Sequence, residues 1–288
     1  MTSLGFIGAG TVGTALAMRL REKGYPVAAV SSRTQASARR LAEMAPGCRV
    51  HETAQGVADE AEMVFITTPD DAIAGVAAGV RWHPGQSVVH TSGACSLEVL
   101  EPARKLGARV GAIHPLQTFA SIQQAIENLP GSTFALEAEG ELLSKLRDIA
   151  HALEGQVVEL RGGDRALYHA AAVFACNYWV TLVKLAADLW GGFGVPTDQA
   201  VKALIPLLRG TLNNLAQVGL PQALTGPIAR GDVGTIKRHI EALERKAPEL
   251  LSTYRELGLQ TLPIALAKGK VDEKRAQEIG KILEGVKP

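Results

Sequence analysis

The chain has 288 residues, 47% of them hydrophobic, and a formal net charge of +1. This length predicts one large or two smaller domains with enough apolar material for their cores. Lys and Arg are spread along the chain, so charge patterning does not favour nucleic acid or an anionic membrane as a partner. The three cysteines are far apart and match no metal or CxxC spacing, which predicts no metal site and fits a reducing cytoplasm.

Short apolar runs alternate with helical patterns through the first half of the chain. Seven runs have the composition of strands: LGFIG, PVAAVS, MVFITT, SVVHTS, RVGAIH, STFALE and QVVEL. Alternation of this kind predicts βαβ units and a mostly parallel, doubly wound sheet, that is, an α/β Rossmann domain. The runs are apolar throughout, as expected when helices cover both faces of the sheet.

The first strand leads directly into a glycine-rich turn. Gly8, Ala9, Gly10, Thr11, Val12 and Gly13 form GxGxxG at the start of a helical pattern. The first glycine permits the tight turn, the second lets a pyrophosphate approach the backbone, and the third lets helix and strand pack closely. The loop therefore predicts a dinucleotide site; a purely structural turn is the alternative.

The end of the second strand bears on which dinucleotide binds. An acidic residue that bonds a free 2′-hydroxyl is usual here, but the chain has Ser31, Ser32 and Arg33. A guanidinium can bind a 2′-phosphate, so the sequence predicts NADP (NADPH). The alternative is that Thr34 caps the next helix and Arg33 is solvated.

Two later strands also end in polar residues. Thr67, Thr68 and Pro69 follow one of them and are predicted to line the cofactor crevice, because ligands of open α/β sheets lie at the carboxyl ends of strands. Asp70 and Asp71 are better explained as helix caps. Ser92 follows the next strand, and for it a functional role and an ordinary turn role are equally supported.

The stretch GAIHPLQTF brings an imidazole to the end of another strand of this sheet. His114 should emerge at the crevice near the nicotinamide, where hydride transfer to a carbonyl or imine needs a proton donor. Gln117 can orient the substrate or the imidazole. The alternative is a histidine that bonds a local carbonyl.

Strand patterns stop near residue 161, which predicts a Rossmann domain at 1–161 and an all-α domain at 162–288. The residues at 164–190 form one long helical pattern that is apolar on most of its circumference. It contains Asn177, Lys184 and Asp188, which argue against a membrane span. A helix that is apolar all round must be surrounded by protein, so we expect a homodimer through the helical half.

Two polar residues of the second half are candidates for ligand contacts. Asn177 lies among apolar neighbours and should bond either a backbone group or a ligand. In TGPIARGD, Asp232 should cap the following helix, and Arg230 either clamps a substrate carboxylate or forms an internal salt bridge.

GFIGAGTVGTAL, SGACS, HPLQTF and TGPIARGD together resemble a bacterial family that pairs a Rossmann-like oxidoreductase domain with a helical domain of unknown function. The family is similar in layout to pyrroline-5-carboxylate reductases, prephenate dehydrogenases and ketopantoate reductases, which implies NAD(P) on the first domain and dimerisation through the second. The His-Pro pair of the prephenate dehydrogenases matches His114-Pro115. The Lys-x-x-x-Asn pair of 3-hydroxyacid dehydrogenases is incomplete, because Val173 stands four residues before Asn177. His169 lies two turns before Asn177 and is expected to face the same cleft.

The sequence thus predicts a cytoplasmic NADP-dependent oxidoreductase acting on a small carboxylate-bearing carbonyl or imine, with a ketopantoate-like compound as one candidate. The residues assigned to catalysis are His114, Ser92 and Asn177, and those assigned to the substrate are Gln117, Arg230 and His169. A non-catalytic NADP(H) sensor that signals through its helical domain is the alternative function. A second hydride carrier such as a deazaflavin has no fingerprint in the sequence.

Overall fold

A computed structural model describes residues 2–285. The chain forms two compact units that divide between Cys176 and Asn177. The strand-rich part ends before that point, and the division lies inside a helix that starts at Asp164.

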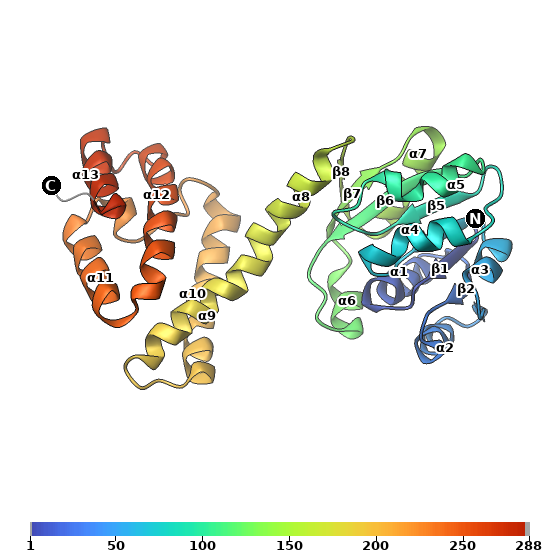
Figure 1. The fold of residues 1–288 in the computed structure, drawn as a ribbon, viewed down its shortest axis with the longest axis horizontal. Helices are drawn as coiled ribbons and strands as arrows, with labels where there is room; N and C mark the ends of the chain where they lie inside the picture. The colour runs from blue at the N-terminus through green and yellow to red at the C-terminus, as the bar shows by residue number, and fades with distance from the viewer. Residues whose placement is uncertain (1, 286–288) are drawn as a thin grey trace. The chain divides into compact units, whose positions relative to one another are not determined.

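The first unit is built on one eight-stranded sheet in the order β3-β2-β1-β4-β5-β6-β7-β8 (Figure 1). All neighbours are parallel except β6 and β7. The mostly parallel Rossmann-like sheet confirms the predicted fold class, and each of the seven predicted strands is present. The strands are β1 (Leu4–Ile7), β2 (Val27–Ser31), β3 (Arg49–Val50), β4 (Met63–Ile66), β5 (Ser87–His90), β6 (Arg109–Leu116), β7 (Thr133–Glu137) and β8 (Gln156–Glu159).

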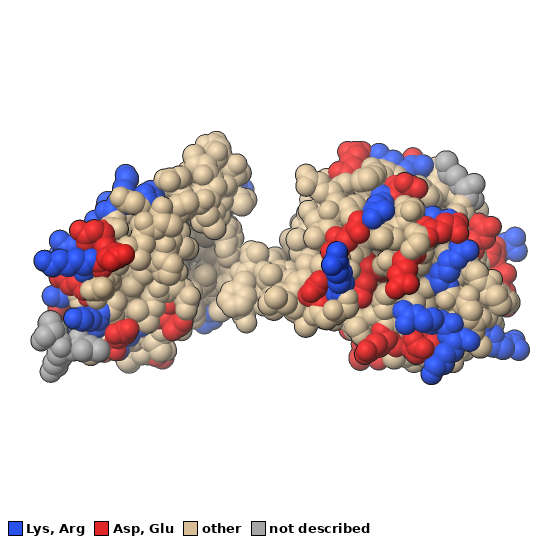
Figure 2. Space-filling model, turned by 90° about the horizontal axis from the view of Figure 1, so that it is seen from above, with Lys and Arg blue, Asp and Glu red and all other residues tan. Residues whose placement is uncertain are grey.

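Helices bury apolar side chains against both faces of this sheet, which explains why its strands are apolar throughout. One face is covered by α1 (Thr11–Glu22), α2 (Gln35–Met44), α6 (Ile122–Asn128) and α7 (Gly140–Ala152). The other is covered by α3 (Ala54–Glu60), α4 (Asp70–Gly79), a 3₁₀ turn η1 (Leu97–Leu100) and α5 (Glu101–Lys105). On the face shown in Figure 2, acidic and basic side chains intermix over this unit, without a basic stripe.

Four strands end level with one another at the carboxyl edge of the sheet. Ile7 is in register with both Ser31 and Ile66, and Ile66 with His90. β6 runs further, since His90 pairs with Ala112 and the strand continues to Leu116. His114 therefore stands two residues beyond the end of β5, at the edge where ligands of such sheets bind.

One continuous helix spans Asp164–Gly191, as predicted. It consists of α8 (Asp164–Ala172), a π turn η2 (Val173–Asn177) and α9 (Tyr178–Gly191). By length and composition alone it could cross a membrane, although long helices of soluble proteins pass the same test. Among residues 2–285 it is the single helix that passes this test. Of its most apolar stretch of 18 residues, 6% is buried within the chain.

The second unit continues with helices alone. They are α10 (Thr197–Val218), η3 (Ile228–Arg230), α11 (Val233–Lys246), η4 (Pro248–Leu250), α12 (Leu251–Ala267) and α13 (Glu273–Glu284). Ile236, Ile279 and Leu283 form the centre of a small core between α11, α12 and α13. Asp232 and Asp272 cap α11 and α13, each accepting a backbone N–H of the first turn, and the cap at Asp232 confirms the prediction. Helix α10 runs through Pro206.

Candidate functional site

The glycine-rich turn has the geometry of a phosphate-binding loop. Gly8 adopts φ +113°, and a Cβ there would lie 2.7 Å from the carbonyl of Thr67. A Cβ on Gly13 would lie 2.5 Å from the carbonyl oxygen of Gly8, so α1 packs directly on the loop. Gly10, by contrast, has no atom within 4 Å of its Cβ position. The surface over Gly10 is therefore open to a ligand, next to the free N–H groups that begin α1.

A pocket of about 540 Å³ lies beside this loop. The predicted cofactor residues that line it are Gly8, Ser31, Ser32, Arg33, Thr68 and Pro69. Arg33 is the cation among the lining residues, and Glu52 and Asp71 are the acids. Of the other predicted residues, Ala9 is buried, Thr11 and Val12 begin α1, and the Thr67 hydroxyl donates to the Gly8 carbonyl at 2.6 Å.

Buried polar atoms without a partner gather at the same edge of the sheet. Among residues 2–285, five buried side-chain nitrogen or oxygen atoms lack a hydrogen bond. Four belong to the first unit: Thr68 Oγ1, His90 Nε2, Arg165 Nη2 and His169 Nδ1. An unsatisfied buried polar group costs about 1–3 kcal/mol, so such groups mark a place where a ligand or water completes the bonding. The carboxyl edge is therefore the candidate active site.

His114 is partly buried there between α8 and the turn that follows β5. Its Nδ1 lies 2.8 Å from the hydroxyl of Tyr168, and its ring stands edge-on to that of His169 at 6.2 Å between centroids. A Cβ on Gly93 would lie 2.9 Å from His114 Nε2 and 2.8 Å from His169 Nδ1. Two imidazole nitrogens thus converge beside a glycine that has no side chain to separate them. The structure places His169 next to His114.

The pKa of His114 is lowered from 6.5 to about 4. Burial is the largest cause, followed by the charges of His169 and Arg165, and Asp70 opposes them weakly. The pKa of this imidazole thus lies below the range in which an exposed histidine titrates. At pH 7 His114 is neutral, and it can act as an N–H donor in the way a neutral imidazole polarises a carbonyl.

His90 is fully buried on the neighbouring strand β5, and its pKa is also lowered. Burial, and then the charge of Arg165, lower its pKa to about 3. Its Nδ1 accepts the backbone N–H of Ser92 at 3.2 Å, which requires the unprotonated nitrogen. The site is thus built to hold two neutral imidazoles next to a buried guanidinium.

These two pKa values predict a pH dependence of stability. Both lie below the ordinary histidine value of 6.5, so the unfolded chain binds these protons first as the pH falls. The stabilisation is complete above about pH 6.5 and is lost as the pH falls toward about 4, by up to about 1.4 kcal/mol per pH unit for each histidine. Urea unfolding at about pH 7 and about pH 5 measures this loss. His114→Gln should flatten the dependence, and an equally steep one would contradict the assignment to His114.

Ser92 was expected equally as a substrate ligand or a turn residue, and the structure supports the turn role. Its hydroxyl donates to Asp70 at 2.8 Å and accepts the N–H groups of Ala94 and Cys95 at 3.1 and 3.0 Å. One donor and two lone pairs are then fully used, which leaves no position for a substrate. The cap predicted for Asp70 is also wrong, because its carboxylate bonds Ser92 instead of the first turn of α4.

Arg165 ties the start of α8 to this turn. Its side chain is 3% exposed, and Nε donates to the Glu137 carboxylate at 2.5 Å. Nη1 donates to the Ser92 carbonyl at 2.7 Å. The guanidinium therefore joins β7, the turn after β5 and α8, and its charge reaches both His90 and His114.

Three other predicted site residues have different surroundings. The Gln117 amide bonds the loop between β6 and β7, through the Asn128 carbonyl and the Thr118 N–H, instead of contacting His114. Asn177 is exposed and belongs to the second unit, so its amide does not lie in an apolar core. Arg230 is exposed on the η3 turn near Asp232, and it helps to lower the pKa of that carboxyl after the bonds from Thr235.

Comparison with known proteins assigns both halves of the chain. A Rossmann-like domain matches residues 1–115, and a domain of unknown function, DUF2520, matches residues 132–261. The chain joins a Rossmann-like domain to a DUF2520 domain. This confirms the family predicted from the glycine loop and the HPLQTF and TGPIARGD stretches. No curated protein matches the sequence.

Solved structures share this two-part architecture. BF3122 of Bacteroides fragilis, provisionally assigned as an NADP oxidoreductase, is 29% identical over 90% of this chain and 97% of its own, with a TM-score of 0.72. TM1727 of Thermotoga maritima is 25% identical over 92% and 99%, with a TM-score of 0.74. A 1-pyrroline-5-carboxylate reductase of Streptococcus pyogenes is 16% identical over 97% and 98%, with a TM-score of 0.62, and shows the fold alone.

Sequence reasoning for this Rossmann-like/DUF2520 chain missed three members of the site. Arg165 carried no signal, because its partners lie 28 and 73 residues away. Tyr168 is an aromatic residue in an apolar helical pattern, and a core position is the usual assignment for such a residue. His90 stands at the end of the run SVVHTS. A histidine that ends an otherwise apolar central strand is the signal that could have found it.

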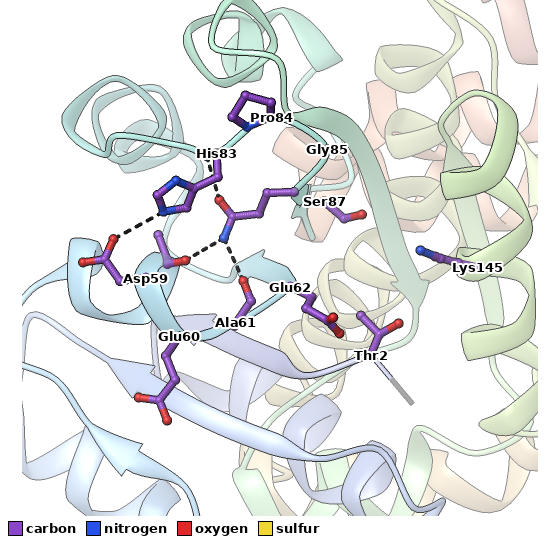
Figure 3. Close-up of a pocket in the computed structure, with 12 residues that line it drawn as sticks. Thr2, Asp59, Glu60, Ala61, Glu62, His83, Pro84, Gly85, Ser87 and Lys145 are labelled. Atoms are coloured by element: carbon purple, nitrogen blue, oxygen red, sulfur yellow. Dashed lines mark hydrogen bonds and ion pairs between the residues drawn. The ribbon is translucent and has the colours of Figure 1, made fainter.

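A second pocket, of about 390 Å³, lies at the opposite, amino edge of the sheet (Figure 3). Its polar groups bond one another: Gln86 Nε2 donates to the carbonyls of Ala58 and Ala61, both at 2.7 Å, and His83 lies 3.5 Å from Asp59. Among residues 2–285 no cluster of His, Cys, Asp and Glu could hold a metal ion. The buried polar atoms of the first unit that lack a hydrogen-bond partner lie at the carboxyl edge instead, which favours that edge over the amino edge as the active site.

Proposed function

We propose that this chain is an NADP(H)-dependent oxidoreductase acting on a small carboxylate-bearing carbonyl or imine. The observation that carries the proposal is the pocket at the carboxyl edge, where the open loop at Gly10, the unpartnered hydroxyl of Thr68 and the guanidinium of Arg33 lie along one side of the sheet. The assignment of BF3122, which is similar over nearly the whole chain, supports the cofactor.

The residues present fit an NADP(H) molecule. Backbone N–H groups at the start of α1 would hold the pyrophosphate, and Arg33 with Ser31 and Ser32 would hold the 2′-phosphate. The bound cofactor supplies the hydride. Neutral His114 then acts at the substrate oxygen or nitrogen, the atom that needs a hydrogen-bond donor and a proton when its carbon is reduced.

The substrate class is the finer part of the proposal. 1-Pyrroline-5-carboxylate, for which the S. pyogenes enzyme is named, is a small imine that bears a carboxylate. His169 faces His114, which supports its proposed role at the substrate. Arg230 and Asn177 are exposed on the second unit, and their roles as substrate contacts stay proposals. Three cysteines that are all free fit the proposed cytoplasmic location.

Cofactor preference tests the assignment of Arg33. NADPH should bind more tightly than NADH, and Arg33→Ala should weaken NADPH binding by about tenfold or more, because a charged phosphate contact contributes about 1.5–3 kcal/mol. NADH affinity should change little. Fluorescence titration of both cofactors measures the ratio. Arg40→Ala, an exposed arginine of α2 outside the pocket, is the matched control. An unchanged ratio in Arg33→Ala would remove the argument for NADP.

We also propose that the protein is a homodimer through its helical half. Within the second unit α9 packs on α10, yet Ala187 and Ala200 are the buried residues of these two helices. Large apolar side chains remain exposed on both, including Val180 (71%), Leu207 (67%) and Leu212 (55%). Exposed apolar surface of this extent marks an interface, and a second copy is its simplest partner.

Light scattering at micromolar concentration is expected to give twice the chain mass. Val180→Glu should dissociate the dimer, because it would bury an unpaired carboxylate in the proposed interface. Ser252→Glu adds the same charge at an exposed position of α12 and should leave the dimer intact. A monomeric wild-type chain, or one that stays in solution only with detergent, would count against the proposal.

A further inference from the structure

One polar contact of the candidate site has no part in the proposed function. It joins His114 to Tyr168 of α8. Tyr168 Oη lies 2.8 Å from His114 Nδ1, and the two rings meet edge-on at an angle of 86°. The contact links the end of β6 to a helix 54 residues later in the chain. Burial raises the pKa of Tyr168 to about 12, so its hydroxyl keeps its proton at neutral pH.

The surroundings of His114 decide how many protons its ring carries. Burial, His169 and Arg165 oppose a positive charge on it, and Asp70 is the acid that favours one. The ring is therefore neutral and holds one proton, on either Nδ1 or Nε2. A phenol is a good donor and a weak acceptor, because its oxygen lone pair is shared with the ring. A hydrogen bond from Tyr168 Oη to Nδ1 accordingly leaves the proton on Nε2.

We propose that Tyr168 is a positioning residue that holds His114 in the tautomer with its proton on Nε2, the nitrogen that converges with His169 Nδ1 beside Gly93. The role of this tautomer in turnover rests on the proposed function, whereas the tautomer itself does not. A single substrate atom beside Gly93 could contact both nitrogens. His169 Nδ1 is one of the buried atoms that lack a partner, as expected of a group that completes its bonding with a ligand.

The arrangement also accounts for the proton that the reduction of a carbonyl or imine requires. The Nε2–H bond breaks and the proton joins the substrate oxygen or nitrogen, while Nδ1 takes the proton of Tyr168 and leaves a tyrosinate. An alkoxide is a stronger base than a tyrosinate, so the transfer is favourable. Water then gives a proton to Nε2 and leaves as hydroxide, and Nδ1 gives its proton back to the tyrosinate of Tyr168. The net donor is water, and the imidazole and the phenol end as they began.

Nitrogen-15 NMR of the imidazole rings tests the tautomer directly. In the wild-type protein His114, assigned by the loss of its signals in His114→Gln, should show a protonated Nε2 and an unprotonated Nδ1. Tyr168→Phe keeps the ring and removes the donor, so the two tautomers should become mixed. Tyr254→Phe is the matched control, since Tyr254 lies 3.0 Å from His239 Nδ1 in the second unit and its loss should leave His114 unchanged. A wild-type proton on Nδ1, or an unchanged pattern in Tyr168→Phe, overturns the proposal.

Turnover gives a second readout, with pyruvate and 1-pyrroline as probe substrates for NADPH oxidation. Tyr168→Phe should lower kcat by about tenfold or more, with NADPH affinity unchanged, because a misplaced proton removes part of an acid–base contribution of about 10²–10⁴. An unchanged kcat contradicts the relay. If the wild-type protein oxidises NADPH with neither of the two probe substrates, the proposed function fails. The NMR result still decides the tautomer.

Discussion

Replacing His114 by glutamine is expected to lower turnover by about 10²–10⁴-fold, the contribution of a positioned acid or base. NADPH affinity should be unchanged, because the residues that line the cofactor pocket lie at or after the ends of β1, β2, β3 and β4, whereas His114 belongs to β6. Glutamine keeps an N–H donor but cannot pass a proton between two nitrogens. The loss should therefore appear in kcat rather than in the Kd for NADPH.

His151→Gln provides the control, since His151 is exposed at the end of α7 in the same unit. It should leave both kcat and Kd at their wild-type values. Equal turnover in wild type and His114→Gln would make His114 a structural residue, held by Tyr168 and packed on Gly93.

Replacing Arg165 by methionine is expected to lower the free energy of unfolding by about 3–5 kcal/mol, the cost of leaving one partner of a buried ion pair alone. Its partner Glu137 has a side chain that is 12% exposed, and the Ser92 carbonyl would lose its donor as well. The pKa values of His90 and His114 should both rise, because the Arg165 charge lowers them in the intact protein. Urea unfolding and NMR titration measure the two effects separately.

Arg147→Met is the matched control, because Arg147 and Glu159 form an ion pair with side chains 40% and 46% exposed. An exposed pair contributes about 0–1 kcal/mol, so this variant should unfold close to wild type. The double variant Arg165→Met with Glu137→Gln should recover part of the loss, since it removes the stranded charge. Similar losses in Arg165→Met and Arg147→Met would show that burial of the first pair does not matter.

Most of the fold of the first unit was predictable because its signals are local. Apolar runs between helical patterns identified seven of eight strands, and the one missed, β3, is two exposed residues, Arg49 and Val50. The three glycines of the loop each have the surroundings that their spacing predicted: a left-handed turn at Gly8, open space at Gly10 and a close helix at Gly13. The long helix and the cap at Asp232 were also visible in the sequence.

The part of the site that was missed depends on contacts between residues far apart in the chain. Strand order brings His90 and His114 to one edge, but only α8 supplies Tyr168, His169 and Arg165. Burial lowers the pKa of His114 most, and His169 and Arg165 lower it further. Ser92 shows the converse, since the hydroxyl of a polar residue at the right strand end is fully occupied by Asp70 and by its own turn. Hydrogen-bond saturation of this kind is a tertiary property, and residue type alone does not reveal it.

A crystal structure with NADPH bound tests the central claim most directly. The 2′-phosphate should contact Arg33, and nicotinamide C4 should lie within about 6–7 Å of the His114 ring, which leaves room for one reacting carbon and its oxygen at a proton-transfer distance of about 2.6–3.2 Å. A nicotinamide ring directed away from His114, with the space beside Gly93 filled by protein, would contradict the oxidoreductase and favour a non-catalytic NADP(H) sensor.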